Sequence, residues 1–413
     1  MHQEHDSTGK PSRRRFLRLV TLGVGGIVLA ACGATAPTAG DGTAATAAPV
    51  ASGAAATAAP AASGAAGGGF DPAACYRPTA GVTKTVKVDA KAGPYVIALS
   101  NSYIGNVWRT QMIKMAKAYA ETEDVAPLIS EFQVNTADRD DAAQQAAIEN
   151  MISNGAQAIV ILANTPTALV QTVQQARADG IVIVSFDTTV HTDPPDPSLD
   201  LGVTVNEDQV EMGRRWAQWL VDETGGEGKI LMVNGVQGTG VDQERRQGAA
   251  EVWNANPGIS IVEVIGDWDP GKAQTVTATA LAANPDFAGV WCQGGTDGVV
   301  RAFLDAGVPL VPVAGEAENG FRKQMLEYKD QFKGYSIGQS PGLVAVSMRA
   351  ALSLLMGEPV PQAVSVPLPE ATTDQLVPGV NVFPDAPDNF FTATSIPPCG
   401  VNLSFEEVDA QQV

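Results

Sequence analysis

The chain has 413 residues, a formal net charge of −19 and four cysteines. This length accommodates two domains of ordinary size, each with its own hydrophobic core. The strong acidity argues against a nucleic-acid partner, because contacts with phosphates need clustered lysine and arginine. We therefore expect no nucleic-acid binding.

The first 31 residues have the features of an export signal. Three arginines at 13–15 resemble the twin-arginine pattern, and an uncharged apolar run follows over 19–31. The run is shorter than the roughly 20 residues that span a bilayer. Its end, Leu-Ala-Ala-Cys-Gly, resembles a bacterial lipobox with Cys32 as the lipidated residue. An uncleaved anchoring helix is the alternative. Either way, we expect an exported body held on the outer face of the cytoplasmic membrane by its anchor only.

Residues 32–69 are predicted to be a disordered tether. After Cys32 they are almost wholly Ala, Gly, Thr, Pro and Ser, which cannot bury enough apolar surface to offset the entropy of ordering. Cys75 and Cys399 lie near the two ends of the remaining chain. In an exported protein they form a natural disulfide pair, although sequence alone does not fix the pairing. Cys292 lies in an apolar run and is expected to be a buried thiol.

From residue 95 onward, short apolar runs alternate with amphipathic stretches. The alternation predicts parallel sheets with helices on both faces, in two similar α/β lobes. The predicted strands cover 96–100, 128–134, 156–162, 180–186, 229–233, 259–265, 288–292, 308–314 and 332–338. The predicted helices cover 107–121, 138–154, 167–179, 245–253, a segment ending near 283, 297–305 and 343–356.

Polar residues in the loops after these strands are the candidate ligand contacts. Ligands of open parallel sheets bind beyond the carboxyl ends of strands, and a cleft between two domains is a preferred site. Asp187 ends the fourth strand of the first half, and Glu316 ends the equivalent strand of the second half. The other candidates are Ser102, Asn106, Trp108, Arg109, Asn164, Thr165, Thr188, Arg245, Trp268, the 294–297 turn and Asn319.

This combination of residue types favours binding of a polyhydroxylated ligand. Carboxylates, amides and guanidinium groups form paired hydrogen bonds to neighbouring hydroxyls, and aromatic faces suit the C–H face of a sugar ring. Each candidate also has a structural alternative: Trp108 as core, Asp187 as a cap of the next segment, Arg245 in a surface ion pair.

Catalytic and metal chemistry is poorly supported by the sequence. Without residues 1–31 the chain retains one histidine, His191, so a multi-histidine metal site is excluded and a Ser-His-Asp mechanism depends on one loop residue. We therefore expect no metal and no cofactor.

From about residue 95 to residue 358, the chain resembles the ribose-type (type 1) periplasmic binding proteins, which bind sugars for ABC importers. The resemblance is carried by Ile-Ala-Leu-Ser-Asn-Ser-Tyr-Ile-Gly-Asn-Val-Trp-Arg at 97–109, Val-Ile-Val-Ser-Phe-Asp at 182–187, Arg-Arg-Gln-Gly at 245–248 and Ser-Ile-Gly-Gln at 336–339. It implies two lobes joined by a three-segment hinge, with crossings near 204–208, near 338–342 and later. The implied first lobe is 94–207 plus about 340–375, the second is 208–339, and 376–413 form an extension packed on the body.

The resemblance also implies roles for the candidate residues. Asn106, Trp108 and Arg109 line the first-lobe wall, Asp187 grips hydroxyls, Arg245 binds from the second lobe, Trp268 stacks, Glu316 accepts hydrogen bonds and Gln339 lies at the hinge. The sequence departs from the family pattern at Arg109, Gly294 and Glu316, which indicates a ligand other than ribose.

The predicted function is sugar capture by a monomer whose closed form docks on an ABC permease. The first alternative is a sensory lipoprotein that presents its ligand to a membrane receptor; a neighbouring permease or histidine-kinase gene would discriminate the two. The least favoured alternative is a glycoside hydrolase with Asp187 and Glu316 as its carboxylate pair. Closure on a ligand accounts for both carboxylates without catalysis, so we predict a non-enzymatic protein.

Overall fold

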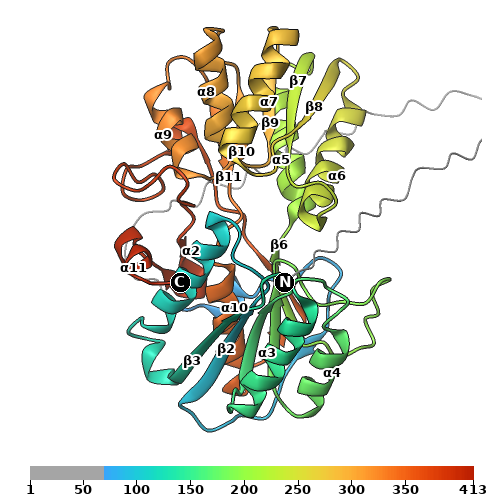
Figure 1. Cartoon of the computed structure of the whole chain (residues 1–413), viewed down its shortest axis with the longest axis vertical. Coiled ribbons are helices and arrows are strands. Elements are labelled where there is room, and N and C mark those ends of the chain that lie inside the picture. Colours follow the sequence, from blue (N-terminus) through green and yellow to red (C-terminus); the bar gives the residue numbers. More distant parts are fainter. Residues whose placement is uncertain (1–68) are drawn as a thin grey trace, which may run out of the picture. The chain divides into compact units, whose positions relative to one another are not determined.

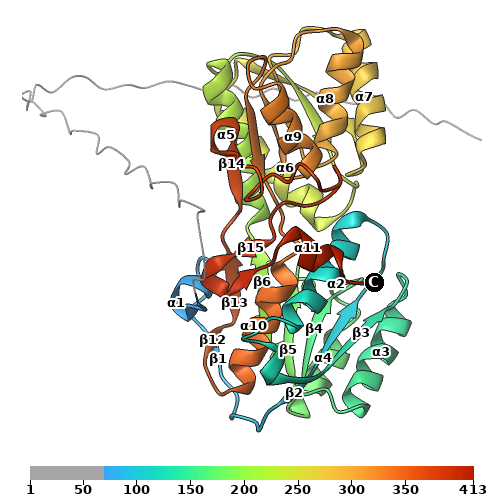
Figure 2. The ribbon, with the colours of Figure 1, turned by 90° about the vertical axis from the view of Figure 1, so that its left-hand side faces the viewer.

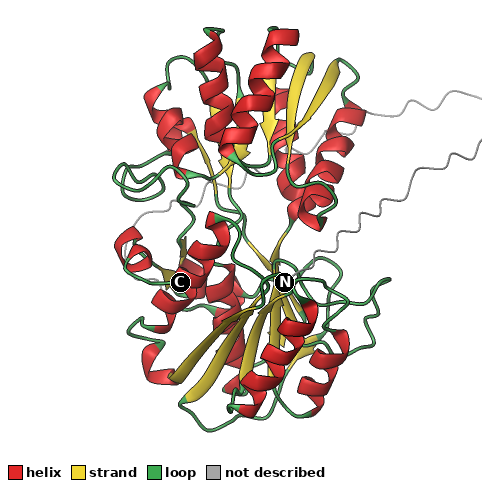
Figure 3. Cartoon of the chain, in the orientation of Figure 1, coloured by secondary structure: helices red, strands yellow, loops and turns green. Residues whose placement is uncertain are grey.

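The computed structural model describes residues 69–413. The predicted export signal, the lipidation site Cys32 and the tether up to residue 68 lie outside the described residues. Figure 1 shows two α/β lobes, each built around its own sheet, and Figure 3 shows helices flanking both sheets. The predicted α/β class with two parallel-dominated sheets is confirmed.

The first-lobe sheet has six parallel strands in the order β13-β6-β5-β4-β2-β3. Its central strands β4 and β5 consist of buried, mostly branched apolar residues, as expected for strands covered on both faces. Helices α3 and α4 cover one face, and α2 and α10 cover the other. The bounds are β2 Tyr95–Asn101, α2 Val107–Ala120, β3 Ile129–Thr136, α3 Asp141–Ser153, β4 Ala158–Leu162, α4 Val170–Ala178, β5 Val182–Phe186, β6 Val203–Glu207, α10 Leu343–Leu355 and β13 Ala363–Val366.

The second-lobe sheet has the order β14-β11-β10-β9-β7-β8, with only β14 antiparallel to its neighbour. Helices α5 and α6 pack on one face, and α7, α8 and α9 pack on the other. The bounds are α5 Gln209–Thr224, β7 Gly228–Asn234, α6 Gly240–Ala255, β8 Ile259–Ile265, α7 Pro270–Ala283, β9 Gly289–Cys292, α8 Thr296–Ala306, β10 Val313–Glu316, α9 Asn319–Glu327, β11 Gly334–Ile337 and β14 Glu370–Thr372.

Two predictions for the second lobe need correction. The strand expected over 308–314 begins only at Val313. Pro309 and Pro312 lack the N–H that a strand inside a sheet must donate, which explains the late start. The sequence places Trp216 and Trp219 on a helix but predicts no range for α5, and it does not predict α9.

Three segments connect the two lobes in chain order. The first crossing joins β6 to α5 at Asp208, the second covers 338–342, and the third covers 367–369 between β13 and β14. The second and third crossings are joined by the Gly338 N–H, which donates to the Pro369 carbonyl at 2.9 Å. The family resemblance implies that residues 370–372 belong to the first lobe. Because β14 pairs with β11, they belong to the second lobe instead.

The C-terminal extension adds a fourth crossing at 391–394. Before it, the Asn319 side chain holds the extension on the second lobe through hydrogen bonds to the backbone of residues 383–387. At Phe391 the backbone exchanges two hydrogen bonds of 2.8 Å with the side chain of Gln111 on α2. Its neighbour Thr392 donates its N–H to the Ala317 carbonyl at 3.1 Å. Adjacent residues of the extension are therefore held by different lobes.

The end of the extension lies on the first lobe. Strands β15 (Ser395–Ile396) and β16 (Val401–Asn402) form a small hairpin, and helix α11 (Phe405–Asp409) packs beside α2, as Figure 2 shows. Lys114 on α2 pairs with Asp409 at 3.2 Å.

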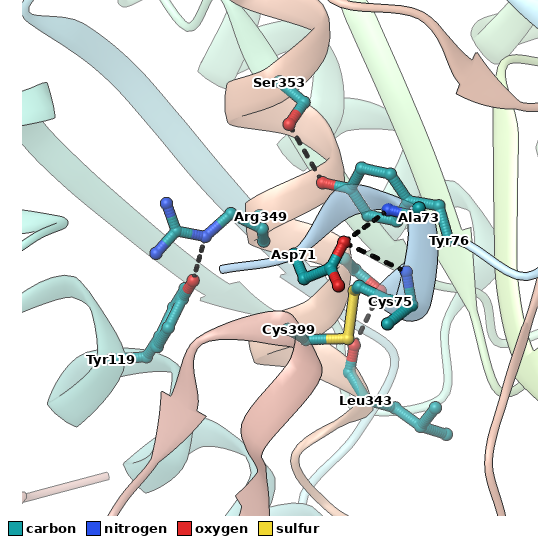
Figure 4. Close-up of a disulfide and its surroundings, with 11 residues drawn as sticks. Asp71, Ala73, Cys75, Tyr76, Tyr119, Leu343, Arg349, Ser353 and Cys399 are labelled. Carbon is teal, nitrogen blue, oxygen red and sulfur yellow. Dashed lines mark hydrogen bonds between the residues drawn. A yellow bond between two sulfur atoms is a disulfide. The ribbon is translucent and has the colours of Figure 1, made fainter. Parts of the chain in front are cut away.

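The predicted disulfide between Cys75 and Cys399 is present (Figure 4). It joins α1 (Pro72–Cys75), at the beginning of the described chain, to the C-terminal hairpin. Beside it, the Tyr76 hydroxyl shares a 3.0 Å hydrogen bond with Ser353 on α10. Cys292 is a buried free thiol whose pKa is raised by burial to about 12, so it has little thiolate character.

Candidate functional site

Gln339, in the second crossing, contacts four predicted site residues from both lobes. Its side-chain amide N–H donates to the Asp187 carboxylate, and its amide oxygen accepts from Nη2 of Arg245 at 3.1 Å. Its backbone N–H donates to Oε1 of Glu316 at 2.6 Å. Its backbone carbonyl accepts from the indole N–H of Trp108 at 2.9 Å. These residues therefore form one hydrogen-bonded group at the hinge.

The second-lobe wall is built around Arg245, which projects from α6 and is only 1% exposed. Its Nη1 donates to the Glu316 carboxylate and to the Gln293 carbonyl, both at 2.9 Å, and its Nε donates to the Gln209 side chain at 2.8 Å. Burial raises the pKa of Glu316, and the charge of Arg245 opposes that rise. Arg245 is therefore a buried, multiply bonded group, which rules out the surface ion pair considered for it.

The first-lobe wall presents Asp187 at the end of β5. Its backbone has a φ of 54°, and the Asn206 side chain donates to its carbonyl at 3.0 Å. The Thr188 hydroxyl lies 3.4 Å from the carboxylate. Burial raises the pKa of Asp187, while the nearby Arg109 charge lowers it. The next regular element after Asp187 is β6, so its carboxylate does not cap a helix.

Arg109 and Trp108 reach this wall from the first turn of α2. The Asn106 side chain caps the helix by accepting the Arg109 N–H at 3.0 Å. Nη1 of Arg109 donates to the Ser102 hydroxyl at 2.8 Å, and the guanidinium carbon lies 3.9 Å from the centre of the Tyr103 ring. Arg109 is only 7% exposed, and these partners are uncharged. Trp108 is both packed in the first-lobe core and bonded to the hinge.

Asn164 and Trp268 lie outside the hydrogen-bonded groups around Gln339 and Arg109. Asn164 donates to the Asp141 carboxylate at 2.7 Å and to the Arg139 carbonyl. Trp268 has a left-handed backbone with a φ of 57°, and its indole packs closely on Gly235 and Gly294. Its indole N–H is buried without a hydrogen-bond partner. The indole N–H of Trp268 is therefore unpaired, and Trp268 forms no hydrogen bond with Asp187, Arg245 or Glu316.

Three polar residues that the sequence reading did not select complete the arrangement. Gln209 and Gln293 brace Arg245, as described above. Glu207, the last residue of β6, is 4% exposed and accepts the Ser340 N–H at 3.2 Å. A signal for Glu207 existed, because it ends the short alternating stretch over 203–207 just before the first crossing.

The arrangement is suited to recognition by hydrogen bonds. Asp187 and Glu316 each accept a hydrogen bond from the uncharged Gln339. Arg245 is the positively charged residue of the group bonded to Gln339, and it pairs with Glu316. Carboxylates held this way are acceptors for ligand hydroxyls. Within residues 69–413 no three His, Cys, Asp or Glu side chains are grouped to hold a metal ion. None of the helices in that range is long and apolar enough to cross a membrane.

Residues 97–359 match the family model described as a periplasmic binding protein domain. The match covers well over half of the chain and includes all eleven predicted ligand contacts.

Individual relatives are more distant but cover much of the chain. The ribose import binding protein of Bacillus subtilis is 23% identical over 278 residues, which is 66% of this chain and 86% of the relative. The xylitol-binding protein of Mycolicibacterium smegmatis is 25% identical over 247 residues, covering 59% and 68%. Among solved structures, an ABC transporter solute-binding protein of Actinobacillus succinogenes with bound D-allose is 25% identical. It has a TM-score of 0.59 over 68% of this chain and 98% of its own.

Proposed function

The chain belongs to the periplasmic binding protein family, and on that premise we propose that it captures a sugar between its two lobes and delivers it to an ABC permease. The family and these relatives are binding proteins rather than enzymes. The interlobe position of Gln339 is the single observation that carries the proposal. A ligand that contacts both lobes at this point shifts the hinge equilibrium toward closure.

The ligand we propose is an uncharged sugar or polyol with several neighbouring hydroxyls. The named relatives are binding proteins for ribose and xylitol, and the solved neighbour holds D-allose. Asp187, Glu316 and Arg245 can pair with adjacent hydroxyls, and Trp108 and Trp268 offer aromatic surface. The proposed contacts are Ser102, Asn106, Trp108, Arg109, Asn164, Asp187, Thr188, Arg245, Trp268, Glu316 and Gln339.

Ligand titration tests the sugar proposal directly. The purified protein is heated with D-ribose, D-allose, D-xylose, L-arabinose, xylitol and glycerol, and with succinate as a non-sugar control. A sugar at 100 times its dissociation constant should stabilise the fold by about 2.7 kcal/mol. If every sugar and polyol leaves the unfolding temperature unchanged, the sugar proposal is wrong and only the fold assignment stands.

We further propose that the protein works as a monomer tethered outside the cytoplasm through a lipid on Cys32. The lipobox-like sequence before Cys32 supports the anchor. A Cys32→Ala variant should move from the membrane fraction to the medium or the periplasm. Cellular uptake of a radiolabelled sugar that binds in the titration should also fall. Uptake that persists in cells lacking this protein would contradict delivery to a permease.

A further inference from the structure

Glu207 is a buried carboxyl group between the first two crossings. It ends β6, and its Oε1 accepts the backbone N–H of Ser340 in the second crossing at 3.2 Å. Its other oxygen, Oε2, is buried without any protein partner. A carboxylate would leave that oxygen charged and unsatisfied, which is costly in a buried position. A carboxylic acid with its proton on Oε2 carries no charge there, so the cost falls to that of one unpaired hydroxyl.

The charged groups around Glu207 come from three other elements. Glu316 approaches from β10, Asp187 from the loop after β5, and Arg245 from α6. Burial raises the pKa of Glu207 well above its usual range, the two carboxylates raise it further, and Arg245 and the Ser340 N–H oppose the rise. Three carboxyl groups thus face one guanidinium, so ionisation of Glu207 would leave two negative charges uncompensated among these four groups.

We propose that Glu207 is a positioning residue of the sugar site, which carries a proton while the lobes close and accepts the Ser340 N–H through its uncharged carbonyl oxygen. This inference rests on the proposed sugar-binding function. The proton removes one negative charge beside Asp187 and Glu316, which can then remain ionised as acceptors for ligand hydroxyls. Loss of the proton adds repulsion to the hinge and opposes the close approach of the two lobes.

The pH dependence follows from the direction of the effect. A carboxyl group whose pKa is higher in the folded chain than in the unfolded chain makes the folded state less stable as pH rises between the two values. In the proposed closed state an ionised Glu207 repels Asp187 and Glu316, so ligand affinity should fall as pH rises through the pKa of Glu207. The Glu207→Gln side chain has nearly the same shape and retains an oxygen that can accept the Ser340 N–H, but it cannot ionise.

The experiment compares the full-length wild type with Glu207→Gln, using D-ribose, D-allose and xylitol as probes at pH 7 and pH 9.5. We expect Glu207→Gln to bind within about twofold of the wild type at pH 7. Wild-type affinity should fall by about three- to tenfold at pH 9.5, and the variant should show no such fall. Glu131→Gln, the same change at an exposed position on β3, should retain the wild-type pH profile.

The ligand-free proteins provide a second measurement. The wild type should lose thermal stability relative to Glu207→Gln as pH rises from 5 to 9.5, whether or not a probe sugar binds, because the unfolded chain ionises Glu207 at its ordinary pKa while the folded chain retains the proton. If no probe sugar binds at any pH but this stability difference is present, the sugar-binding proposal is wrong, while the proposal that Glu207 carries a proton stands. Identical pH profiles of the wild type and Glu207→Gln, or a loss of binding in Glu207→Gln at pH 7, would overturn the inference. If Glu207→Gln does not fold, a wild-type affinity that is constant from pH 7 to pH 9.5 overturns it equally.

Discussion

The two walls of the site differ in how firmly their charged groups are held. In the second lobe, Arg245 is almost fully buried and is bonded to Glu316, Gln209 and the Gln293 carbonyl. In the first lobe, Asp187 is partly exposed and Arg109 has only uncharged hydrogen-bond partners. The second wall is thus held together by its own side chains, whereas the first wall retains unused hydrogen-bonding capacity.

This difference separates stability from recognition. Changes in the second wall should damage the fold and the binding together, because a broken buried pair leaves an uncompensated charge. Changes in the first wall should reduce affinity with little loss of stability. The following variants test that contrast, in order of their expected effect on sugar affinity.

Arg245→Ala should abolish sugar binding and destabilise the protein by about 3–5 kcal/mol, because Glu316 then remains buried without its ion-pair partner. Isothermal titration and urea unfolding measure the two effects. Arg214→Ala is the control: its side chain pairs with the half-exposed Glu251 at 2.7 Å, and its loss should cost less than about 1 kcal/mol. A stable Arg245→Ala variant that merely fails to bind would show that the second wall does not support the fold.

Asp187→Asn should weaken sugar binding by about 10- to 100-fold, because hydrogen bonds to a charged acceptor become bonds to a neutral amide. Stability should change little, since asparagine tolerates the left-handed backbone of this position. Titration calorimetry and thermal unfolding provide the two values. Asp200→Asn, the same change at an exposed carboxylate that pairs with Arg177, should leave affinity unaltered. Equal losses in the two variants would remove Asp187 from the site.

Gly235→Ala tests the placement of Trp268 in the second lobe. A β-carbon at Gly235 would lie 2.2 Å from the indole nitrogen, so the ring must move. We expect about fivefold weaker sugar binding, which corresponds to roughly 1 kcal/mol. Gly240→Ala is the control, because its β-carbon would have no heavy atom within 4 Å. Unchanged affinity in Gly235→Ala would argue that Trp268 does not contact the ligand.

Joint replacement of Cys75 and Cys399 by serine should have the smallest effect on affinity, less than about twofold, because the disulfide lies outside both walls. The stability of the fold should nevertheless fall by about 2–5 kcal/mol. Each single replacement should match the pair, since either one removes the same bond. A large change in affinity would show instead that the disulfide acts on the hinge.

The sequence predicts the central strands well because their signal is local. β4 and β5 are short continuous apolar runs, and burial on both faces requires that composition. The bounds of α5 are not predicted although Met212, Trp216 and Leu220 recur at helical spacing, because charged and polar residues fill the positions between them. β10 begins late because of Pro309 and Pro312. A prediction based only on apolar residues does not include the effect of proline on strand pairing.

The site is predicted only in part, for a physical reason. The rule that ligands bind beyond strand ends selects Asp187 and Glu316 without any structure. The contacts of Gln339 with both depend on how two separate sheets are joined, which no local pattern encodes. The same holds for Glu207, whose partner Ser340 is 133 positions away. A neutral role for a glutamate cannot be recognised before its burial is known.

The disulfide also gives the body a closed covalent circuit. Cys75 and Cys399 are 324 positions apart, so the bond encloses both sheets and all four crossings in one ring. One proteolytic cut anywhere between the two cysteines opens the ring but releases no fragment. A nicked molecule should therefore run as one species on a non-reducing gel and as two after reduction. Both lobes thus remain attached to the same chain after damage to any single surface loop.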